Sequence, residues 1–436
     1  MMFKMKKIIS AVLLCLPLGL MAQNPAPKTA QSKPTVLTGA TIHLGNGKVV
    51  ENGLIAFENG VITAVGPAST AVSRTGAEVI DLSGKHIFPG VIAMGSTIGI
   101  QEIASVRATL DYEEIGEINP HIRSLVAYST DSEVIPTLRA SGVLLAQSVP
   151  QGGVVSGSSS VFNTDGWNWE DAVIRKDDGI WLTWPAYLSR SFNFEDFSFT
   201  TKKNEKRAET INLLESTFAD AKAYDEIAKP ELTNIRLDAM KNLFTGKQNL
   251  YIRASYAKDI IDAVKFAKKF GIDKVVIVGG SEADKVAPFL KENNVPVVLG
   301  ALHSLPSRPD DDVYAVYELP AKLHKAGVKV ALSYDDEWWR VRNLPYQAGT
   351  AAAFGDISKE DALMFLTQNP AQIMGIDAQV GTLEKGKHST LIVTNGNMMD
   401  MRGNVVEHAF IKGAKVSLDN KQLRLYEKYK EKYGQE

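Results

Sequence analysis

The chain contains few of the residues that most often bind metals or act as nucleophiles. It has one cysteine, Cys15, and seven histidines among 436 residues. Because Cys15 lies in the apolar segment near the N-terminus, the rest of the chain has no thiolate to bind a metal, form a disulfide or attack a substrate. An excess of positive charge is also absent, since the formal net charge is -2. Such a chain has no field to attract a phosphate backbone, and we expect no nucleic-acid partner.

The first 22 residues have the composition of a targeting segment. Lysines at positions 4, 6 and 7 precede the apolar run "IISAVLLCLPLGLM", and Ala22 comes directly before Gln23. This run is of secretory rather than membrane-spanning length, so we predict a signal peptide over 1–22. A spacer over 23–34 follows it. The resulting expectation is a periplasmic or secreted protein whose mature form has no transmembrane segment.

The two ends of the chain share one pattern and the middle has another. Residues 35–86 alternate in polarity around three Asn-Gly pairs, and residues 381–418 alternate around a fourth, so we predict one β-sandwich domain composed of both segments. Between them, short apolar runs such as "KVVIVGG" precede stretches of helical length, which favours a barrel or a doubly wound sheet.

Three further segments carry separate predictions. Residues 190–247 show no clear strand. The segment "QGGVVSGSSS", which begins at Gln151, is predicted to be a tightly turned or mobile loop. Residues 419–436 are predicted to form a C-terminal helix.

Several segments, in order and spacing, resemble the amidohydrolase superfamily, in particular its imidazolonepropionase-like branch. They include "GATIHLGNGKVVENGLIAFENGVITAVGP", "VIDLSGKHIFPGVI", "GVKVALSYDD" and "LTQNPAQIMGIDAQVGTLEKGKHSTLIV". The resemblance implies an α/β fold with a (β/α) TIM-like barrel over 87–380 and a site at the barrel mouth. It also implies hydrolysis of non-peptide C–N bonds in cyclic amide or peptide-like small molecules, with zinc or another divalent metal.

The positions that would hold the metal in such an enzyme carry other residues here. By the resemblance, the strand-one pair falls on Gly95 and Thr97, the strand-five ligand on Arg253, the strand-six ligand on Gly279 and the strand-eight ligand on Asp335. Glycine offers no side-chain donor, and arginine does not lose its proton. We therefore predict that the metal site is dismantled and that no metal cofactor is bound.

The same strand ends supply the residues expected in the cleft. Asp335 is a candidate general base, and His303 is a candidate acid-base group or a structural hydrogen-bonding residue. Ser255, Asp336 and Trp338 are expected to line the cleft together with the replaced ligand positions. The six tryptophans occur in pairs in predicted loops, where they would either grip a ligand or form satellite core.

Two functions follow from these residues. In the first, the protein binds a small amide or peptide-like ligand, or a related amidohydrolase chain, without turnover. In the second, it is an active hydrolase with a rearranged mechanism that uses Asp335, His303 and Arg253. In either case we predict that Arg253 and Asp335 form a direct or water-bridged ion pair that takes the place of the metal.

Overall fold

The computed structural model describes residues 27, 30–194, 198–306, 311–334 and 338–435. The predicted signal peptide lies outside the described residues. Within the described ranges, no helix combines the length and the apolar character that crossing a membrane requires.

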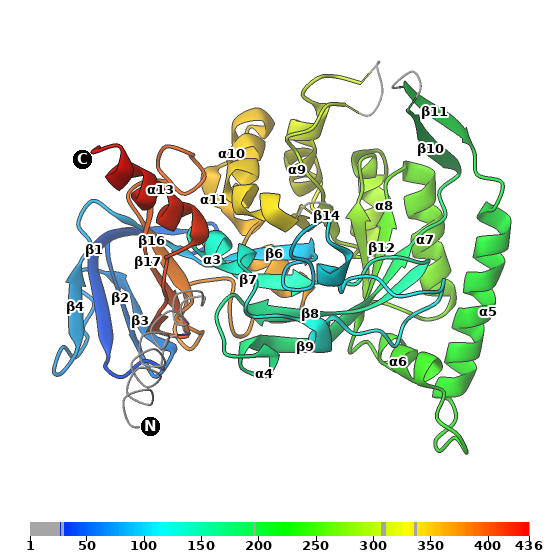
Figure 1. Cartoon of the computed structure of the whole chain (residues 1–436), viewed down its shortest axis with the longest axis horizontal. Helices are drawn as coiled ribbons and strands as arrows, with labels where there is room; N and C mark the ends of the chain where they lie inside the picture. The colour runs from blue at the N-terminus through cyan, green and yellow to red at the C-terminus, as the bar shows by residue number, and fades with distance from the viewer. Residues whose placement is uncertain (1–26, 28–29, 195–197, 307–310, 335–337, 436) are drawn as a thin grey trace, which may run out of the picture.

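The two ends of the chain form one eight-stranded sheet (Figure 1). Strand β1 pairs with β2 on one side and with β4 and β5 on the other, and β16 from the C-terminal segment pairs with β5. Apolar side chains such as Leu37, Phe57 and Leu391 pack into the core of this sheet domain. The strands are β1 (Thr35–His43), β2 (Val49–Glu58), β3 (Val61–Pro67), β4 (Glu78–Asp81), β5 (His86–Pro89), β16 (Leu391–Thr394), β17 (Val406–Ile411) and β18 (Ala414–Lys415).

The second sheet is the barrel, and it is nearly closed. Its strand order is β15-β14-β13-β12-β9-β8-β7-β6. A bridge between Met94 and Ser333 joins the first and last strands, and the Ser333 hydroxyl donates to the Met94 carbonyl at 2.6 Å. The predicted fold class, a TIM-like barrel with a smaller sheet domain, is confirmed. The barrel strands are β6 (Val91–Ser96), β7 (Val143–Ser148), β8 (Val155–Asn163), β9 (Val173–Thr183), β12 (Asn249–Ala254), β13 (Val275–Gly279), β14 (Val297–Leu299) and β15 (Val330–Leu332).

Helices surround the β12–β15 part of the barrel, where continuous apolar strands alternate with amphipathic segments (Figure 1). In α7, for example, Ile260, Ala263 and Val264 are buried. The helices before β12 are η1 (Arg107–Thr109), α2 (Ser124–Ala127), α3 (Val134–Arg139), α4 (Trp169–Ala172), α5 (Arg207–Asp225) and α6 (Ile235–Phe244). Those after it are α7 (Ala257–Lys269), η2 (Ala283–Val286), α8 (Ala287–Glu292), α9 (Ala315–Lys325), η3 (Trp338–Asn343), α10 (Leu344–Gly355), α11 (Lys359–Met364), α12 (Gln368–Ile373) and α13 (Lys421–Lys432).

Strand β8 corrects the prediction made for "QGGVVSGSSS". From Val155 onward this segment is a fully buried strand and not a loop. It runs antiparallel to both β7 and β9 and lies between them in the sheet. In a regular barrel a crossover helix outside the sheet would connect these two strands. Hydrogen bonds satisfy the buried hydroxyls of Ser159 and Ser160, whereas the buried Ser156 hydroxyl has no partner among the described residues.

A hairpin adds two strands that the sequence did not predict. Strands β10 (Leu188–Asn193) and β11 (Ser198–Lys203) pair with each other after β9 and project from the body of the protein (Figure 1). They fall partly in 190–247, the stretch for which no clear strand was predicted. The rest of that stretch contains helices α5 and α6.

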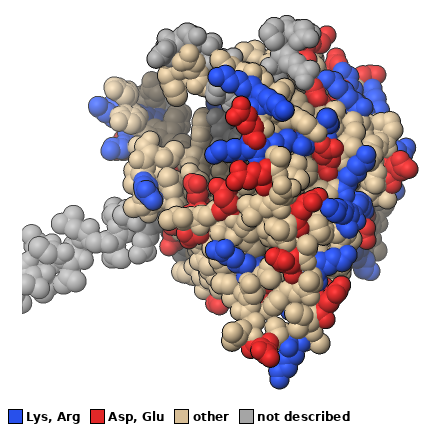
Figure 2. Space-filling model, turned by 90° about the vertical axis from the view of Figure 1, so that its right-hand side faces the viewer, with Lys and Arg blue, Asp and Glu red and all other residues tan. Residues whose placement is uncertain are grey.

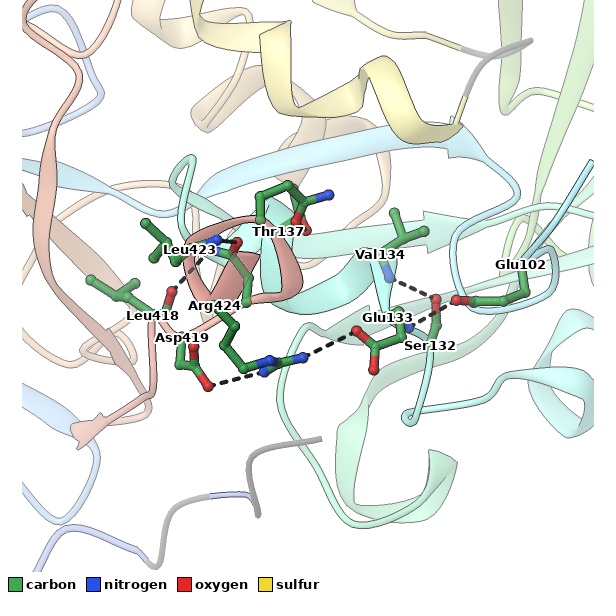
Figure 3. A network of polar contacts seen from close by, with 11 residues as sticks. Glu102, Ser132, Glu133, Val134, Thr137, Leu418, Asp419, Leu423 and Arg424 are labelled. Atoms are coloured by element: carbon green, nitrogen blue, oxygen red, sulfur yellow. Dashed lines mark hydrogen bonds and ion pairs between the residues drawn. The ribbon is translucent and has the colours of Figure 1, made fainter. Parts of the chain in front are cut away.

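The C-terminal helix α13 is tied to the barrel through polar contacts (Figure 3). Arg424 lies between Asp419 and Glu133, with nitrogen–oxygen distances of 3.0 and 3.4 Å. The Glu133 amide in turn donates to Glu102, on the segment that follows β6, at 3.0 Å. The helix is therefore linked through Glu133 to the segment that follows β6.

The face shown in Figure 2 carries acidic and basic side chains side by side. Neither sign forms a continuous patch on this face, in keeping with the formal net charge of -2.

Candidate functional site

The positions singled out by the sequence lie where strands of the barrel end. Gly95 is in the last two residues of β6, Arg253 precedes the last residue of β12, and Gly279 ends β13. Thr97 follows β6 directly. Asp335 and Asp336, the predicted strand-eight ligand and its neighbour, lie outside the described residues.

The donor atoms at these positions do not fit a divalent metal of the kind implied by the resemblance. The Gly95 amide donates to the Gln147 side-chain carbonyl at 3.0 Å, and the Thr97 hydroxyl donates to Gln101 at 2.7 Å. The Arg253 guanidinium lies over the Trp181 ring, 4.7 Å from its centroid. Across the described part of the chain, no three His, Cys, Asp or Glu side chains converge as metal ligands would.

A buried hydrogen-bond network occupies this side of the barrel interior. Its centre is the carboxylate of Asp178, which is fully buried on β9. Gln147 donates to it at 2.8 Å, Tyr251 at 2.7 Å and Ser159 at 2.6 Å. The Trp181 indole N–H donates to Ser159 at 2.8 Å, and its ring stacks on that of Tyr251. Since Gln147 also binds the Gly95 amide, the network extends to a position where the resemblance places a metal ligand.

Burial dominates the electrostatics of this network. It raises the pKa of Asp178 from 3.8 to about 6, although the hydrogen bonds from Ser159, Tyr251 and Gln147 and the charge of Arg175 act in the opposite direction. Burial, followed by the charge of Asp178, raises the pKa of the Tyr251 phenol well above its ordinary value. At neutral pH the aspartate is therefore an anion held by three neutral donors.

The sequence around Asp178 conceals its role. "KDDG" resembles an exposed turn, yet only Asp177 adopts a positive φ, of 46°. Gly179 then passes so close to the Tyr251 ring that a Cβ atom would lie 2.4 Å from it. A glycine here lets the tyrosine approach Asp178. This close approach depends on the partner strand, so it was not predicted. The only local signal is the alternation along the strand, which puts Gly179 and Trp181 on the same face.

The opposite half of the barrel interior is small and apolar. Residues paired in register on neighbouring strands point to the same face of a sheet. Tyr251 and Arg253 point into the barrel, so their partners on the next three strands do so too. The residues on this face are Val276 and Val278 of β13, Val298 of β14 and Ala331 of β15.

A cleft opens at the C-terminal ends of β12, β13 and β14. Its volume is about 470 Å³. Ser255 and Gly279, both predicted to line a cleft, lie in its wall, whereas Gly95, Thr97 and Arg253 do not. Gly95 and Thr97 are instead buried. The remaining wall combines hydroxyl and acidic groups with apolar side chains, among them Tyr256, Ser281, Glu282, Leu299, Leu302 and Leu319.

Two other predicted residues point away from this cleft. His303 follows β14, but its imidazole is hydrogen-bonded to the Thr350 hydroxyl of α10 at 2.8 Å and is absent from the cleft wall. Trp338 is buried at the start of η3 and is also absent from the wall. The structure therefore gives His303 the contact of a structural residue.

The tryptophans divide between core and surface. Trp181 lies in strand β9 and not in a loop. Both Trp181 and Trp184 are buried, so they are core residues. Trp167 and Trp339 are exposed. None of the six lines the cleft.

The chain is similar to known amidohydrolases in sequence. A sequence profile of the Amidohydrolase family matches residues 308–416. The imidazolonepropionase of Flavobacterium psychrophilum is 22% identical over 394 residues, which cover 84% of this chain and 92% of that protein. The 5-methylthioadenosine/S-adenosylhomocysteine deaminase of Bacillus thuringiensis is 24% identical over 390 residues, covering 82% of this chain and 84% of the relative.

The fold is similar as well. The crystal structure of an amidohydrolase from Thermotoga maritima superimposes with a TM-score of 0.76 at 27% sequence identity. The match covers 88% of this chain and 99% of the other. The likeness therefore includes the sheet domain as well as the barrel.

Proposed function

The chain belongs to the amidohydrolase superfamily as an imidazolonepropionase-like member, and we propose that it binds a small amide or peptide-like molecule at the barrel mouth without metal-dependent hydrolysis. The relatives include an imidazolonepropionase and a 5-methylthioadenosine/S-adenosylhomocysteine deaminase. In our proposal, this chain differs from a metal-dependent hydrolase in the polar side chains that fill the barrel interior.

The network around Asp178 is the observation that carries the proposal. In this network the interior polar side chains of β7, β8, β9 and β12 are hydrogen-bonded to one another. Gln147 also satisfies the Gly95 amide at 3.0 Å. A divalent ion at this place would need anionic or imidazole donors that are free to coordinate it, and it would face the Arg253 cation.

The cleft supplies groups that suit an amide. Hydroxyls of Ser255 and Ser281 and the carboxylate of Glu282 can pair with the N–H and C=O groups of a ligand, and Leu299 and Leu302 can contact its apolar part. The cleft volume of about 470 Å³ is within the range of small-molecule sites. The substrate class implied by the resemblance, a cyclic amide or peptide-like molecule, matches this mixture of groups.

The first test measures metal and turnover on the purified mature protein. After incubation with zinc and desalting, we expect well under one zinc per chain by mass spectrometry, and no hydrolysis in a screen of dipeptides, N-acyl amino acids and cyclic amides. One tightly bound zinc per chain together with turnover would overturn the proposal.

The second test measures binding with matched variants. Ser281→Trp places a large ring in the cleft, whereas Ser216→Trp adds the same ring to the exposed face of α5. Any amide that raises the melting temperature of the wild type should lose this effect in Ser281→Trp and retain it in Ser216→Trp. Equal effects in the two variants would place the ligand elsewhere and contradict the proposed cleft.

Export is part of the proposal. The basic start, the apolar run and Ala22 support cleavage before Gln23 and a periplasmic or secreted location. Intact-mass measurement of the exported protein should give a chain that begins at or next to Gln23. An exported chain that retains Met1 would contradict this. A related amidohydrolase chain remains the proposed alternative partner for the cleft.

A further inference from the structure

A larger cavity lies at the other end of the barrel, away from the mouth. Its volume is about 610 Å³, and it opens at the N-terminal ends of β12, β13, β14 and β15, beside the end of α12. Its walls contain buried apolar side chains, including Val275, Leu290, Val295, Val328 and Ile373. Contact between water and these apolar walls is unfavourable in free energy. An apolar group of a ligand would displace that water and so stabilise its own binding.

Cations surround this apolar floor. Arg175, Lys274, Lys291 and Lys329 all line the cavity. Within the described residues, none of the three lysines forms an ion pair with a carboxylate. Asp273, the one acidic residue among the described residues of the wall, is highly exposed and is paired with Lys268 at 3.1 Å. The cavity therefore presents a net positive charge to whatever enters it.

The arginine is fixed in position by backbone groups. Arg175 donates to the carbonyls of Met374 at 2.5 Å, Gly375 at 3.2 Å and Lys247 at 2.7 Å. Gly375 has φ +63°, and a Cβ atom there would collide with the guanidinium. Glycine at this position thus gives the arginine its place at the cavity wall, where its charge is held by neutral carbonyls.

Lys329 is exposed, but neighbouring protein atoms restrict the hydration of its amino group. This desolvation lowers the pKa of its amino group, and the charge of Asp377 opposes the shift. An anion bound beside Lys329 would restore some of the stabilisation that the ammonium lost on leaving water.

We propose that this cavity is a second binding site, for a small organic anion that combines an apolar body with one carboxylate or sulfonate group. The apolar body would contact Leu290, Val295 and Ile373, and the anionic group would lie among Lys274, Lys291 and Lys329. The site is independent of the mouth cleft, because it lies at the opposite ends of the same strands.

The experiment uses 8-anilinonaphthalene-1-sulfonate, an aromatic sulfonate whose fluorescence reports binding. Lys274→Glu/Lys329→Glu reverses two charges at the cavity and should weaken binding by about tenfold or more. Lys48→Glu/Lys203→Glu makes the same change in net charge at two exposed lysines, in the β1–β2 turn and in β11, and should alter binding by no more than about twofold. Ser281→Trp, in the mouth cleft, should leave probe binding unchanged, which keeps this test separate from that of the proposed function.

Competition identifies the ligand class. Hexanoate should displace the probe from the wild type, whereas hexylamine and inorganic phosphate should do so poorly, since one lacks the negative charge and the other the apolar body. Equal displacement by hexylamine, or equal binding to both double-lysine variants, would overturn the site. If thermal melting shows that the glutamate variant is unfolded, Lys274→Gln/Lys329→Gln replaces it, with an expected loss of about threefold or more.

Discussion

The two halves of the barrel interior differ in what fills them. On the β7, β8, β9 and β12 side, large groups meet in a polar network, with Trp181 stacked on Tyr251 and a carboxylate at the centre. On the β13, β14 and β15 side, the residues on the same face are three valines and an alanine.

The difference explains where space remains in the barrel. Both cavities lie mainly at the ends of strands with small interior side chains, β13–β15, and reach the neighbouring ends of β12; Arg175 of β9 also lines the N-terminal cavity. A barrel interior is normally packed throughout, and here bulky polar groups fill the half formed by β7, β8, β9 and β12. If the two cavities bind ligands as proposed, binding and structural packing use different halves of the barrel.

The largest expected effect comes from removing the centre of the polar half. Asp178→Ala should lower the free energy of unfolding by about 3–5 kcal/mol at pH 7, because Gln147, Ser159 and Tyr251 would lose their common acceptor while buried. Urea unfolding measures this, and Asp220→Ala on the exposed face of α5 is the matched control. A loss below about 1 kcal/mol would show that the network is not structural.

The next effect tests the charge of the same residue. Because the folded-state pKa of Asp178 is raised to about 6 from 3.8, the native state retains a proton that the unfolded state loses, and this contribution to stability is present below pH about 4 and lost as the pH rises through about 6.

The variant Asp178→Asn cannot titrate, so it serves as the reference. The stability of the wild type relative to Asp178→Asn should fall by about 2 kcal/mol from pH about 4 to pH about 7. Urea titrations at several pH values measure the difference. A difference that does not change with pH would contradict burial as the cause of the shift.

A smaller effect is expected in the apolar half. Val298→Ala should cost about 1–3 kcal/mol, because it removes two buried methyl groups and leaves a cavity among other small side chains. Val313→Ala, at an exposed position, is the control. If Val298→Ala destabilised the protein more than Asp178→Ala, the apolar half and not the polar half would contribute more to stability at these positions.

The smallest effect concerns Arg253. Arg253→Ala should cost about 0.5–2 kcal/mol through loss of its contact with the Trp181 face. A double-mutant cycle with Trp181→Phe measures that contact. A second cycle with Asp335→Ala tests the predicted ion pair, which remains a prediction because Asp335 lies outside the described residues; a coupling near zero in the second cycle would refute the pair.

Much of the fold was predictable because its signals are local. The apolar runs that became β12, β13, β14 and β15 are followed by amphipathic helices, a pattern that specifies buried parallel strands. Strand β8 was missed because its serines and glycine have low strand propensity, and their burial depends on partners on β7 and β9. The hairpin of β10 and β11 was missed because it has little apolar alternation.

The site was predictable only in part. Ser255 and Gly279 line a cleft at the ends of β12 and β13, where the sequence put them, and their role in binding stays a prediction. For His303 the sequence left two roles open, and the partner that favours the structural one, Thr350, lies on a helix 47 residues away in the chain. Asp178 was not singled out because an aspartate pair before glycine is typical of turns, and only the three-dimensional approach of Gln147 and Tyr251 makes it an interior residue.

Strand β8 also bears on how the protein reaches its fold. Its antiparallel pairings with β7 and β9 join segments close in the chain, so their loops close at low entropic cost, whereas the contact between Ser333 and Met94 that completes the barrel spans 239 residues. We expect this three-stranded meander to form in the folding nucleus and barrel closure to follow it. Substitutions in β8 should then slow refolding, and substitutions in β15 should mainly accelerate unfolding.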